Sequence, residues 1–440
     1  MEAIPVDKEN DAARPNDSLS QQIYLYNYAF NQDLSCVSIG TSADFRTFTI
    51  SPSLAEVSRR RVNFGGKPSD EYSPVNVASM LFQTNYLGLV LRSNPYKVLL
   101  WDESLSQPPH VLWSRFEVLN VALRRDILCV VSEYKIYVYE FGGQFQVLLH
   151  LATWSNPKGL CCLSVAHPKD WTLACPGSTK GSVRVQVGLN DSISNNIAAH
   201  SNPVANLALN QSGSIVASAS DLGTVIKIFS SSDGQLLYEL RRGISYTQIS
   251  SLVFRPDSKF IVVGSANQTV HVFKLDDQTP ASAASVIASQ VLSKVAEWRG
   301  SSPPDQPATI HLGTSPQSSS GQISRSTSLI PGSMVPKYFQ SSRSFAQFRI
   351  PDYGGGDLVI KGSPISGPLC TFAKHAPNHV LIIHPNGLLY EVTFDESKTE
   401  ITQDCTFVGA TAYFQARPEF TIKSGPVMES ATDEDAWNVL

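Results

Sequence analysis

The chain has 440 residues, a formal net charge of −4 and 42% hydrophobic residues. This acidic balance excludes general nucleic-acid binding, which depends on a basic surface, so any anion site must be local. The seven cysteines include no C-x-x-C pair and no Cys/His cluster at zinc spacing, so we predict reduced thiols, no metal and no other cofactor. No apolar run approaches the about 18 residues of a membrane span, and the N-terminus lacks a signal-peptide core, so we expect a cytoplasmic protein.

In chain order, the polar residues 1–20 predict a disordered N-terminal tail, and short strands follow from there to about residue 415. The strands are predicted from β-branched and aromatic runs separated by turn residues, among them YLGLVL (86–91), ILCVVS (127–132), KIYVYEF (135–141), TVIKIF (224–229), FIVVGSA (260–266) and HVLIIHP (379–385). Helical periodicity is almost absent from these segments. The pattern is typical of an all-β sandwich or propeller.

An internal repeat favours the propeller. The segment SIVASASDLGTVIKIF (214–229) is echoed downstream by KFIVVGSANQTVHVFKL (259–275). Both carry Ser-x-x-x-Thr, as Ser220 with Thr224 and Ser265 with Thr269, at an interval of 45 residues. That interval fits one four-stranded blade of the WD40 type, and weaker echoes elsewhere suit about seven blades. We therefore predict that residues 21–415 form an all-β, seven-bladed WD40-like β-propeller.

Two adjacent arginines lie between the echoes, in YELRRGISYT (238–247). Because strand side chains alternate, Arg241 and Arg242 must point to opposite sides and cannot grip the same anion. Guanidinium and hydroxyl donors suit phosphate, which predicts two separate phosphate pockets. The candidate partners are His200, Ser220 and Thr224 upstream, and Ser265, Thr269 and His271 downstream. An exposed strand end, with Ser and Thr merely occupying turns, is the alternative reading of this motif.

A long segment rich in Ser, Pro, Gln and Ala (274–338) interrupts the pattern inside the sixth predicted blade, and we expect it to be disordered apart from one amphipathic stretch. Pro280 and Gly300 bound this stretch as helix stops. One arc of its helical wheel is apolar and contains Ile287, Val291, Leu292, Val295 and Trp298. Such a helix can lie in a lipid interface, and a helix packed on the propeller or unfolded in solution is the alternative.

Residues 416–440 form an acidic C-terminal tail that ends in DEDAWNVL. Trp437 and Leu440 make a W-x-x-L pattern behind three acidic residues. An extended segment of this kind can add as a strand to the sheet edge of a partner that has a basic rim. A chance match is the alternative, because short motifs of this type arise often.

The combination of motifs resembles the PROPPIN family, the WIPI-type phosphoinositide-binding β-propellers of autophagy. The resemblance covers nearly all the predicted propeller and rests on LRRG (240–243) with its downstream strands, and on AFNQDLSCVSIGT (29–41), LRRDILCVVSEYKIYVYEF (123–141), CPGSTKGSVRV (175–185), AHSNPVANLAL (199–209) and PKYFQSSRSFAQFRIP (336–351). It implies one site of Arg241 with His200, Ser220 and Thr224, and a second of Arg242 with Ser265, Thr269 and His271. The implied ligands are phosphatidylinositol 3-phosphate (PI3P) and phosphatidylinositol 3,5-bisphosphate, and the long loop would be a membrane-inserting segment.

The resemblance also implies partners and a location. It predicts a monomeric effector or scaffold of autophagosome formation on phagophore, endosomal or vacuolar membranes. A lipid-transfer protein would be one partner, and ubiquitin-like modifiers of the GABARAP type would be another, through Trp437 and Leu440. Two segments depart from the family pattern, SADFRTF in the first blade and the short second-blade loop in LRSNPYKVLLWDE, and the second leaves the lipid-transfer contact open.

The sequence carries no motif that argues for catalysis. It has no G-x-S-x-G, no H-E-x-x-H, no phosphate-binding loop and no dinucleotide-binding fingerprint. We therefore predict a binding protein and not an enzyme. The alternative function is a WD40 scaffold of membrane traffic that binds proteins only and does not recognise lipids.

Overall fold

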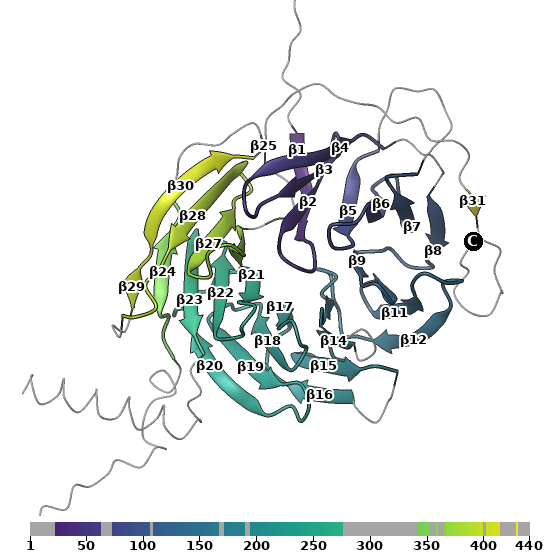
Figure 1. The fold of residues 1–440 in the computed structure, drawn as a ribbon. Helices are drawn as coiled ribbons and strands as arrows, with labels where there is room; N and C mark the ends of the chain where they lie inside the picture. The colour runs from purple at the N-terminus through teal and green to yellow at the C-terminus, as the bar shows by residue number, and fades with distance from the viewer. Residues whose placement is uncertain are drawn as a thin grey trace, which may run out of the picture.

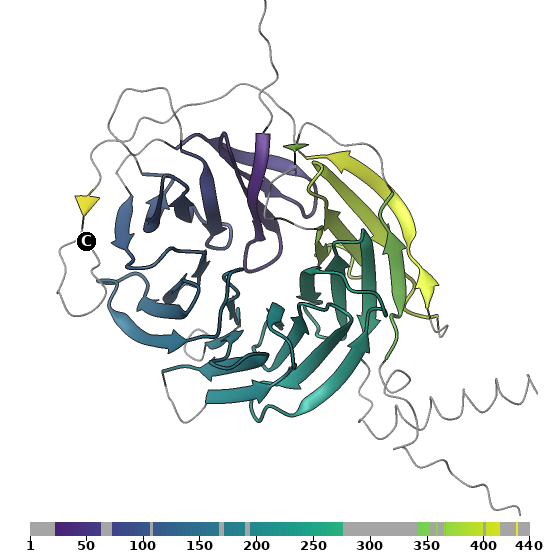
Figure 2. The same cartoon turned by 180° about the vertical axis from the view of Figure 1, so that it is seen from behind.

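The computed structural model describes residues 23–62, 73–105, 109–166, 171–189, 194–275, 342–351, 358–359, 365, 367–398, 402–413 and 428–429. Their strands form seven sheets of four or five strands, set around a common axis (Figures 1 and 2). This arrangement confirms the predicted seven-bladed β-propeller. The predicted interfacial segment 280–300 and the W-x-x-L motif lie outside the described residues.

Each of the first six blades takes four strands in chain order, with the first strand nearest the axis (Figure 1). Blades 1 to 3 contain β1 (Ile23–Phe30), β2 (Cys36–Thr41), β3 (Phe45–Thr49) and β4 (Ala55–Arg60); β5 (Val75–Met80), β6 (Tyr86–Leu91), β7 (Asn94–Asp102) and β8 (His110–Trp113); and β9 (Asn120–Leu123), β10 (Ile127–Val131), β11 (Lys135–Glu140) and β12 (Val147–Ala152).

The remaining blades follow the same plan around the ring. Blades 4 to 6 contain β13 (Cys162–Leu163), β14 (Thr172–Pro176), β15 (Ser182–Val187) and β16 (Ser194–Ala198); β17 (Val204–Leu209), β18 (Ile215–Ser220), β19 (Val225–Ser230) and β20 (Leu236–Arg241); and β21 (Ile249–Phe254), β22 (Phe260–Ser265), β23 (Thr269–Lys274) and β24 (Ala346–Arg349). Blade 7 contains β26 (Leu369–Phe372), β27 (His379–Ile383), β28 (Leu388–Thr393) and β30 (Thr406–Ala412).

The strands that the sequence predicts most clearly are the two central strands of each blade. The predicted run 86–91 coincides with β6, and the runs 135–141 and 260–266 each end one residue beyond β11 and β22. Central strands are covered on both faces by neighbouring blades, so β10 and β22 are buried along their whole length. That environment favours the Val- and Ile-rich runs from which these strands are recognised.

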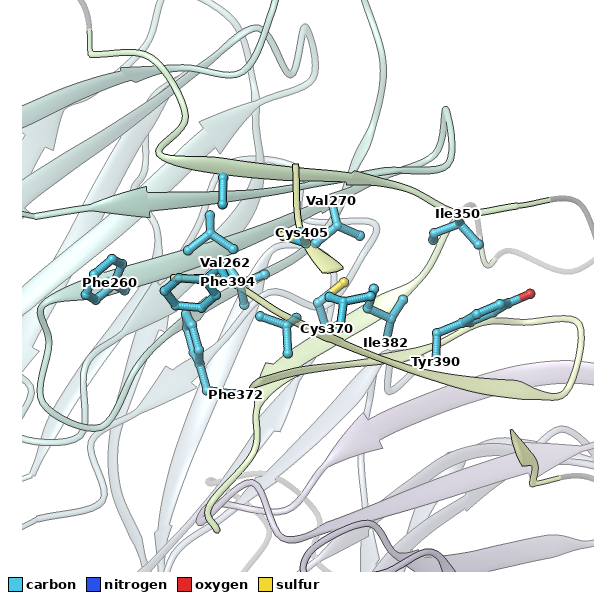
Figure 3. Packing of buried hydrophobic residues seen from close by; sticks show 14 residues of the cluster. Phe260, Val262, Val270, Ile350, Cys370, Phe372, Ile382, Tyr390, Phe394 and Cys405 are labelled. Atoms are coloured by element: carbon cyan, nitrogen blue, oxygen red, sulfur yellow. The ribbon is translucent and has the colours of Figure 1, made fainter. Parts of the chain in front are cut away.

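The hydrophobic core consists of seven clusters of buried residues, one between each pair of neighbouring blades. In the cluster between blades 6 and 7, Phe260 and Val262 face Phe372 and Ile382 (Figure 3). The ring closes in the same way between blades 7 and 1, where the Phe48 and Tyr413 ring centroids are 5.8 Å apart. Because each interface buries side chains from two blades, it also fixes the rim residues that the two blades bring together.

Three two-residue strands join segments that are distant in the chain, and each pairs in parallel. β25 (Leu358–Val359) adds to β1, β29 (Gln403–Asp404) adds to β24, and β31 (Met428–Glu429) adds to β8 (Figure 1). β31 belongs to the segment 416–440, which is predicted from the sequence to be an acidic tail. Its pairing places residues 428–429 at the outer edge of blade 2.

None of the described residues forms a helix that is long and apolar enough to cross a membrane.

Candidate anion-binding rim

The arginine pair lies where the outer strand of blade 5 ends. Arg241 is the last residue of β20, opposite Val225, and Arg242 follows it. Leu240 is fully buried in the cluster between blades 5 and 6, and Arg242 is two residues farther along. Strand alternation therefore turns Arg242 toward blade 6 and Arg241 toward blade 4. The two guanidinium groups serve different blade interfaces.

On the side of blade 5 that faces blade 4, polar residues of three strands and one connection lie together. Val216, two residues before Ser218, packs in the cluster between blades 4 and 5, which places Ser218 and Ser220 on that face. Cross-strand pairing puts Lys227 beside Ser218. We call the following residues the blade 4–5 set: His200, Ser218, Ser220, Lys227 and Arg241.

His200 is oriented within the blade 4–5 set by two contacts. Its Nε2 lies 3.0 Å from Ser218 Oγ, and its backbone N–H donates to Gly181 O at 2.9 Å. Burial, followed by the charge of Lys227, lowers the pKa of His200 to about 4. The imidazole is therefore neutral near pH 7 and acts as a hydrogen-bonding group. Positive charge in this set comes from Lys227 and Arg241.

The interface between blades 5 and 6 holds the second group. Ile261 and Val263 of β22 pack against blade 5, and Ser265 continues the same face. Thr269 pairs with Ser265 on one side and with Arg349 of β24 on the other. We call the following residues the blade 5–6 set: Arg242, Ser265, Thr269, His271 and Arg349.

Hydroxyl groups in the blade 5–6 set are fixed by one another. Ser265 Oγ donates to Asn267 Oδ1 at 2.7 Å, and Thr269 Oγ1 donates to the same oxygen at 2.7 Å. The two hydroxyls are also 2.9 Å apart. Asn267 therefore holds both hydroxyls at the end of the hairpin between β22 and β23.

Arg242 is buried, and the backbone of its own blade holds its guanidinium group. Nε donates to Gly223 O at 2.9 Å, and Nη2 donates to Ser245 O. These bonds use two of the five N–H groups of an arginine, and burial lowers the pKa of Arg242. The pKa of the His271 imidazole is lowered to about 4, first by burial and then by the positive charge of Arg242.

His271 carries a polar atom without a partner. It is only 8% exposed, and its Nδ1 has no hydrogen-bond partner among the residues that the structure describes. A buried polar nitrogen in this state costs free energy unless a ligand or a water satisfies it. Together with the cation of Arg242, this atom makes the blade 5–6 set suitable for an oxyanion.

The hairpins show that the sequence echo is offset by one residue. Four residues connect β18 to β19, whereas three connect β22 to β23. Ser265 pairs with Thr269 across its hairpin, and the same position opposite Ser220 is taken by Val225. Structurally, Thr269 therefore corresponds to Val225, and His271 corresponds to Lys227. Thr224 lies before β19, and its carbonyl accepts the Arg242 N–H at 3.0 Å.

The structure thus brings Arg241, His200 and Ser220 to one interface and Arg242, Ser265, Thr269 and His271 to the next. Sequence reasoning missed Ser218, Lys227 and Arg349. Lys227 interrupts the apolar run VIKIF on the face shared with Val225, and this alternation could have identified it. Arg349 could be found only from the pairing of β23 with β24, which are separated in the chain by residues 275–345. No group of three or more candidate metal ligands occurs within the described ranges.

Comparison with known proteins identifies similar chains. A family model described as PROPPIN matches residues 24–292. The chain is 35% identical over 254 residues to WD repeat domain phosphoinositide-interacting protein 1 of Homo sapiens, covering 57% of this chain and 55% of that protein. It is 29% identical over 413 residues to Autophagy-related protein 18 of Neosartorya fischeri, covering 84% of this chain and 92% of that one. The match to the human relative therefore spans just over half of its length.

Solved structures share the fold at lower identity. Hsv2 of Kluyveromyces lactis has a TM-score of 0.61 and 20% sequence identity, over 89% of this chain and 99% of that one. A complex of KlAtg21 with the coiled coil of AgAtg16 has a TM-score of 0.59 and 18% identity, over 88% and 99% of the two chains. Both likenesses concern the fold.

Proposed function

Because this chain belongs to the PROPPIN family, we propose that it is a peripheral membrane protein that binds PI3P and phosphatidylinositol 3,5-bisphosphate. The blade 4–5 set and the blade 5–6 set each receive one phosphorylated headgroup in this proposal. The observation that carries it is the division of two adjacent arginines between two blade interfaces, each of which also holds a hydroxyl group and a neutral histidine. Guanidinium and hydroxyl donors in this combination suit phosphate oxygens.

The relatives support the same class of ligand and process. The human relative is named for interaction with phosphoinositides, and the fungal one for autophagy. We place this protein among the effectors or scaffolds of autophagosome formation, on phagophore and on endosomal or vacuolar membranes. The segment 280–300 would add an inserted helix, so that three weak contacts act together in one plane.

Protein partners belong to the proposal as well. The solved complex of KlAtg21 with a coiled coil of AgAtg16 supports recruitment of other autophagy proteins by a propeller of this fold. A lipid-transfer protein and ubiquitin-like modifiers of the GABARAP type, the latter through Trp437 and Leu440, are our candidates. A pulldown that the double change Trp437→Ala and Leu440→Ala leaves unaffected would remove the modifier from this list.

Vesicle flotation tests lipid recognition directly. Vesicles with and without PI3P are mixed with the wild-type protein, with Arg241→Thr, with Arg242→Thr and with the double variant. Charge-assisted hydrogen bonds contribute roughly 1.5–3 kcal/mol each, so we expect a loss of about tenfold or more in affinity from each single change. The double variant should no longer respond to PI3P.

Two controls accompany the flotation assay. Arg115→Thr removes an exposed charge from the connection between blades 2 and 3 and should bind like the wild type. Circular dichroism shows whether Arg242→Thr remains folded, since Arg242 is buried. A folded double variant that floats with PI3P vesicles as well as the wild type would exclude lipid recognition by the arginine pair and leave the protein-only scaffold.

A further inference from the structure

The connection from β20 to β21 carries the two most exposed large hydrophobic residues of the described chain. Ile244 is 72% exposed and Tyr246 is 78% exposed, more than Val57 at 62% and Tyr134 at 59%. Both lie within four residues of Arg242. An apolar pair beside a cationic rim is unusual for a connection that has only water to face.

Hydrogen bonds on both sides hold this connection in place. Arg242 binds Gly223 O and Ser245 O through its guanidinium group, and its backbone N–H donates to Thr224 O at 3.0 Å. Farther along, the Thr247 N–H donates to Leu222 O at 3.3 Å. The exposure of Ile244 and Tyr246 is therefore a property of an anchored turn and not of a loose one.

The bond to Arg242 also determines what the turn presents. The carbonyl of Ser245 is turned toward the guanidinium group, and Ser245 separates the two hydrophobic residues. The candidate phosphate ligand Arg242 thus supports the backbone between two apolar side chains. An anion bound to the blade 5–6 set would lie next to an apolar surface. A lipid has the same arrangement, with a charged headgroup next to apolar acyl chains.

We propose that Ile244 and Tyr246 form a membrane anchor that enters the boundary between headgroups and acyl chains when the two sets bind phosphoinositides. This inference rests on the proposed function, because the headgroup sites bring the pair to the bilayer. Tyrosine is enriched at membrane interfaces, where its ring is apolar and its hydroxyl remains hydrated. Two side chains on one turn offer far less area than the roughly 1,000 Å² of a specific protein interface, so a bilayer is the partner that fits.

The double change Ile244→Ser and Tyr246→Ser separates anchoring from headgroup recognition. Binding of soluble inositol 1,3-bisphosphate, measured by calorimetry, should stay at the wild-type value, because neither side chain belongs to either set. Affinity for PI3P vesicles should fall about tenfold to a hundredfold, since two apolar side chains no longer leave water. Tyr134→Ser, in the hairpin between β10 and β11, is the matched control and should bind vesicles normally.

A fluorescent label tests the position of the anchor. An environment-sensitive dye on Ile244→Cys should shift its emission only with PI3P vesicles and should be quenched by shallow spin-labelled lipids. The same dye on Leu189→Cys, in the turn between β15 and β16 at the opposite ends of the strands, should not respond. A dye at position 244 that stays unchanged on bound vesicles would overturn the proposal. So would an emission shift that grows with protein concentration without vesicles, because a second protein molecule would then cover the pair.

The two assays distinguish failure of the anchor from failure of the proposed function. If the serine double variant binds vesicles like the wild type while the arginine double variant does not, only the anchor is excluded. If the wild type binds neither soluble headgroup nor PI3P vesicles, the proposed function falls and the anchor with it.

Discussion

In the blade 4–5 set the histidine is hydrogen-bonded and the Ser220 hydroxyl is open, whereas in the blade 5–6 set both hydroxyl groups are hydrogen-bonded and a histidine nitrogen is open. His200 contacts Ser218, but Ser220 has no side-chain hydrogen bond within the described part of the chain. Across blade 5, Ser265 and Thr269 share Asn267, while Nδ1 of His271 has no described partner. The same types of residue are thus held in different states, and the two sets should differ in stability and in pH response.

The largest effect on stability should come from substitution of Gly223, the turn glycine whose carbonyl accepts a hydrogen bond from Arg242. Gly223 has a φ of 61°, and an added Cβ would lie 1.8 Å from Thr247 O. Gly223→Ala should therefore lower the free energy of unfolding by about 2–4 kcal/mol and displace the connection that carries Ile244 and Tyr246. Urea unfolding measures the change, with Gly243→Ala as the control, because a Cβ at Gly243 meets nothing within 4 Å. Equal midpoints for the two variants would contradict this account.

Substitution of the two arginines should have smaller effects on the free energy of unfolding, and the two effects should differ. Arg242→Ala removes the donor to two backbone carbonyls, and we expect a loss of about 1–3 kcal/mol in the free energy of unfolding. Arg241 is half-buried at the end of β20, and Arg241→Ala should cost clearly less. Chemical denaturation of both variants checks the order. If Arg241→Ala is the more destabilising change, the structural role that we assign to Arg242 is wrong.

The hydroxyl groups of Ser265 and Ser220 should differ by about 1 kcal/mol in their contribution to the free energy of unfolding. Ser265 is fully buried, and Ser265→Ala leaves Asn267 without one of its two hydroxyl donors. Ser220→Ala removes a hydroxyl group without a described partner and should be nearly neutral. Thermal unfolding of the two variants, with soluble headgroup titrated into each, tests the difference. We expect Ser220→Ala to weaken headgroup binding without a change in melting temperature, and a large drop in that temperature would refute the distinction.

The smallest effect concerns pH. The pKa of free His271 is about 4, and a bound phosphate dianion would raise it, so binding takes up a proton. Affinity for soluble headgroup should therefore increase several-fold as the pH falls from about 7.5 toward 5.5. Protonation of the phosphate near pH 6 opposes this trend, so wild type is compared with His271→Gln over the same range. The variant should show the weaker increase, and identical pH profiles would exclude His271 as a phosphate contact.

The sequence predicted the blades better than the contacts between them. Central strands such as β10 and β22 are buried throughout and rich in Val and Ile, and their residue types suffice to place them. Outer strands are harder to recognise, because β16 reads SNNIA and β30 reads TFVGATA, and β30 is exposed along nearly its whole length. Without a covered face, such strands need no regular alternation of apolar residues.

The structure brings most of the predicted rim residues to the two interfaces, but in a register that differs from the one the repeat suggests. In the sequence, the repeat of 45 residues matches Thr224 to Thr269. In the structure, the different hairpin lengths shift this match by one position, so that Thr269 corresponds to Val225. Gly223 and Gln268 both adopt a left-handed φ, of 61° and 64°, in hairpins of different length. Residue types do not reveal this difference, because glutamine is a rare occupant of that region. Arg349 remained hidden because it enters the rim only through the pairing of β23 with β24.

The short parallel strands determine where the ring could come apart. β25 precedes blade 7 in the chain yet is bonded to β1, and β29 leaves blade 7 to bond to β24 before β30 returns. Segments next to and within blade 7 thus form backbone hydrogen bonds with blade 1 on one side and with blade 6 on the other. A pulling force on this ring would therefore not open the seam at which the first and last blades meet. Separation should begin in a sector such as that between blades 3 and 4, where neither blade carries an added parallel strand among the described residues.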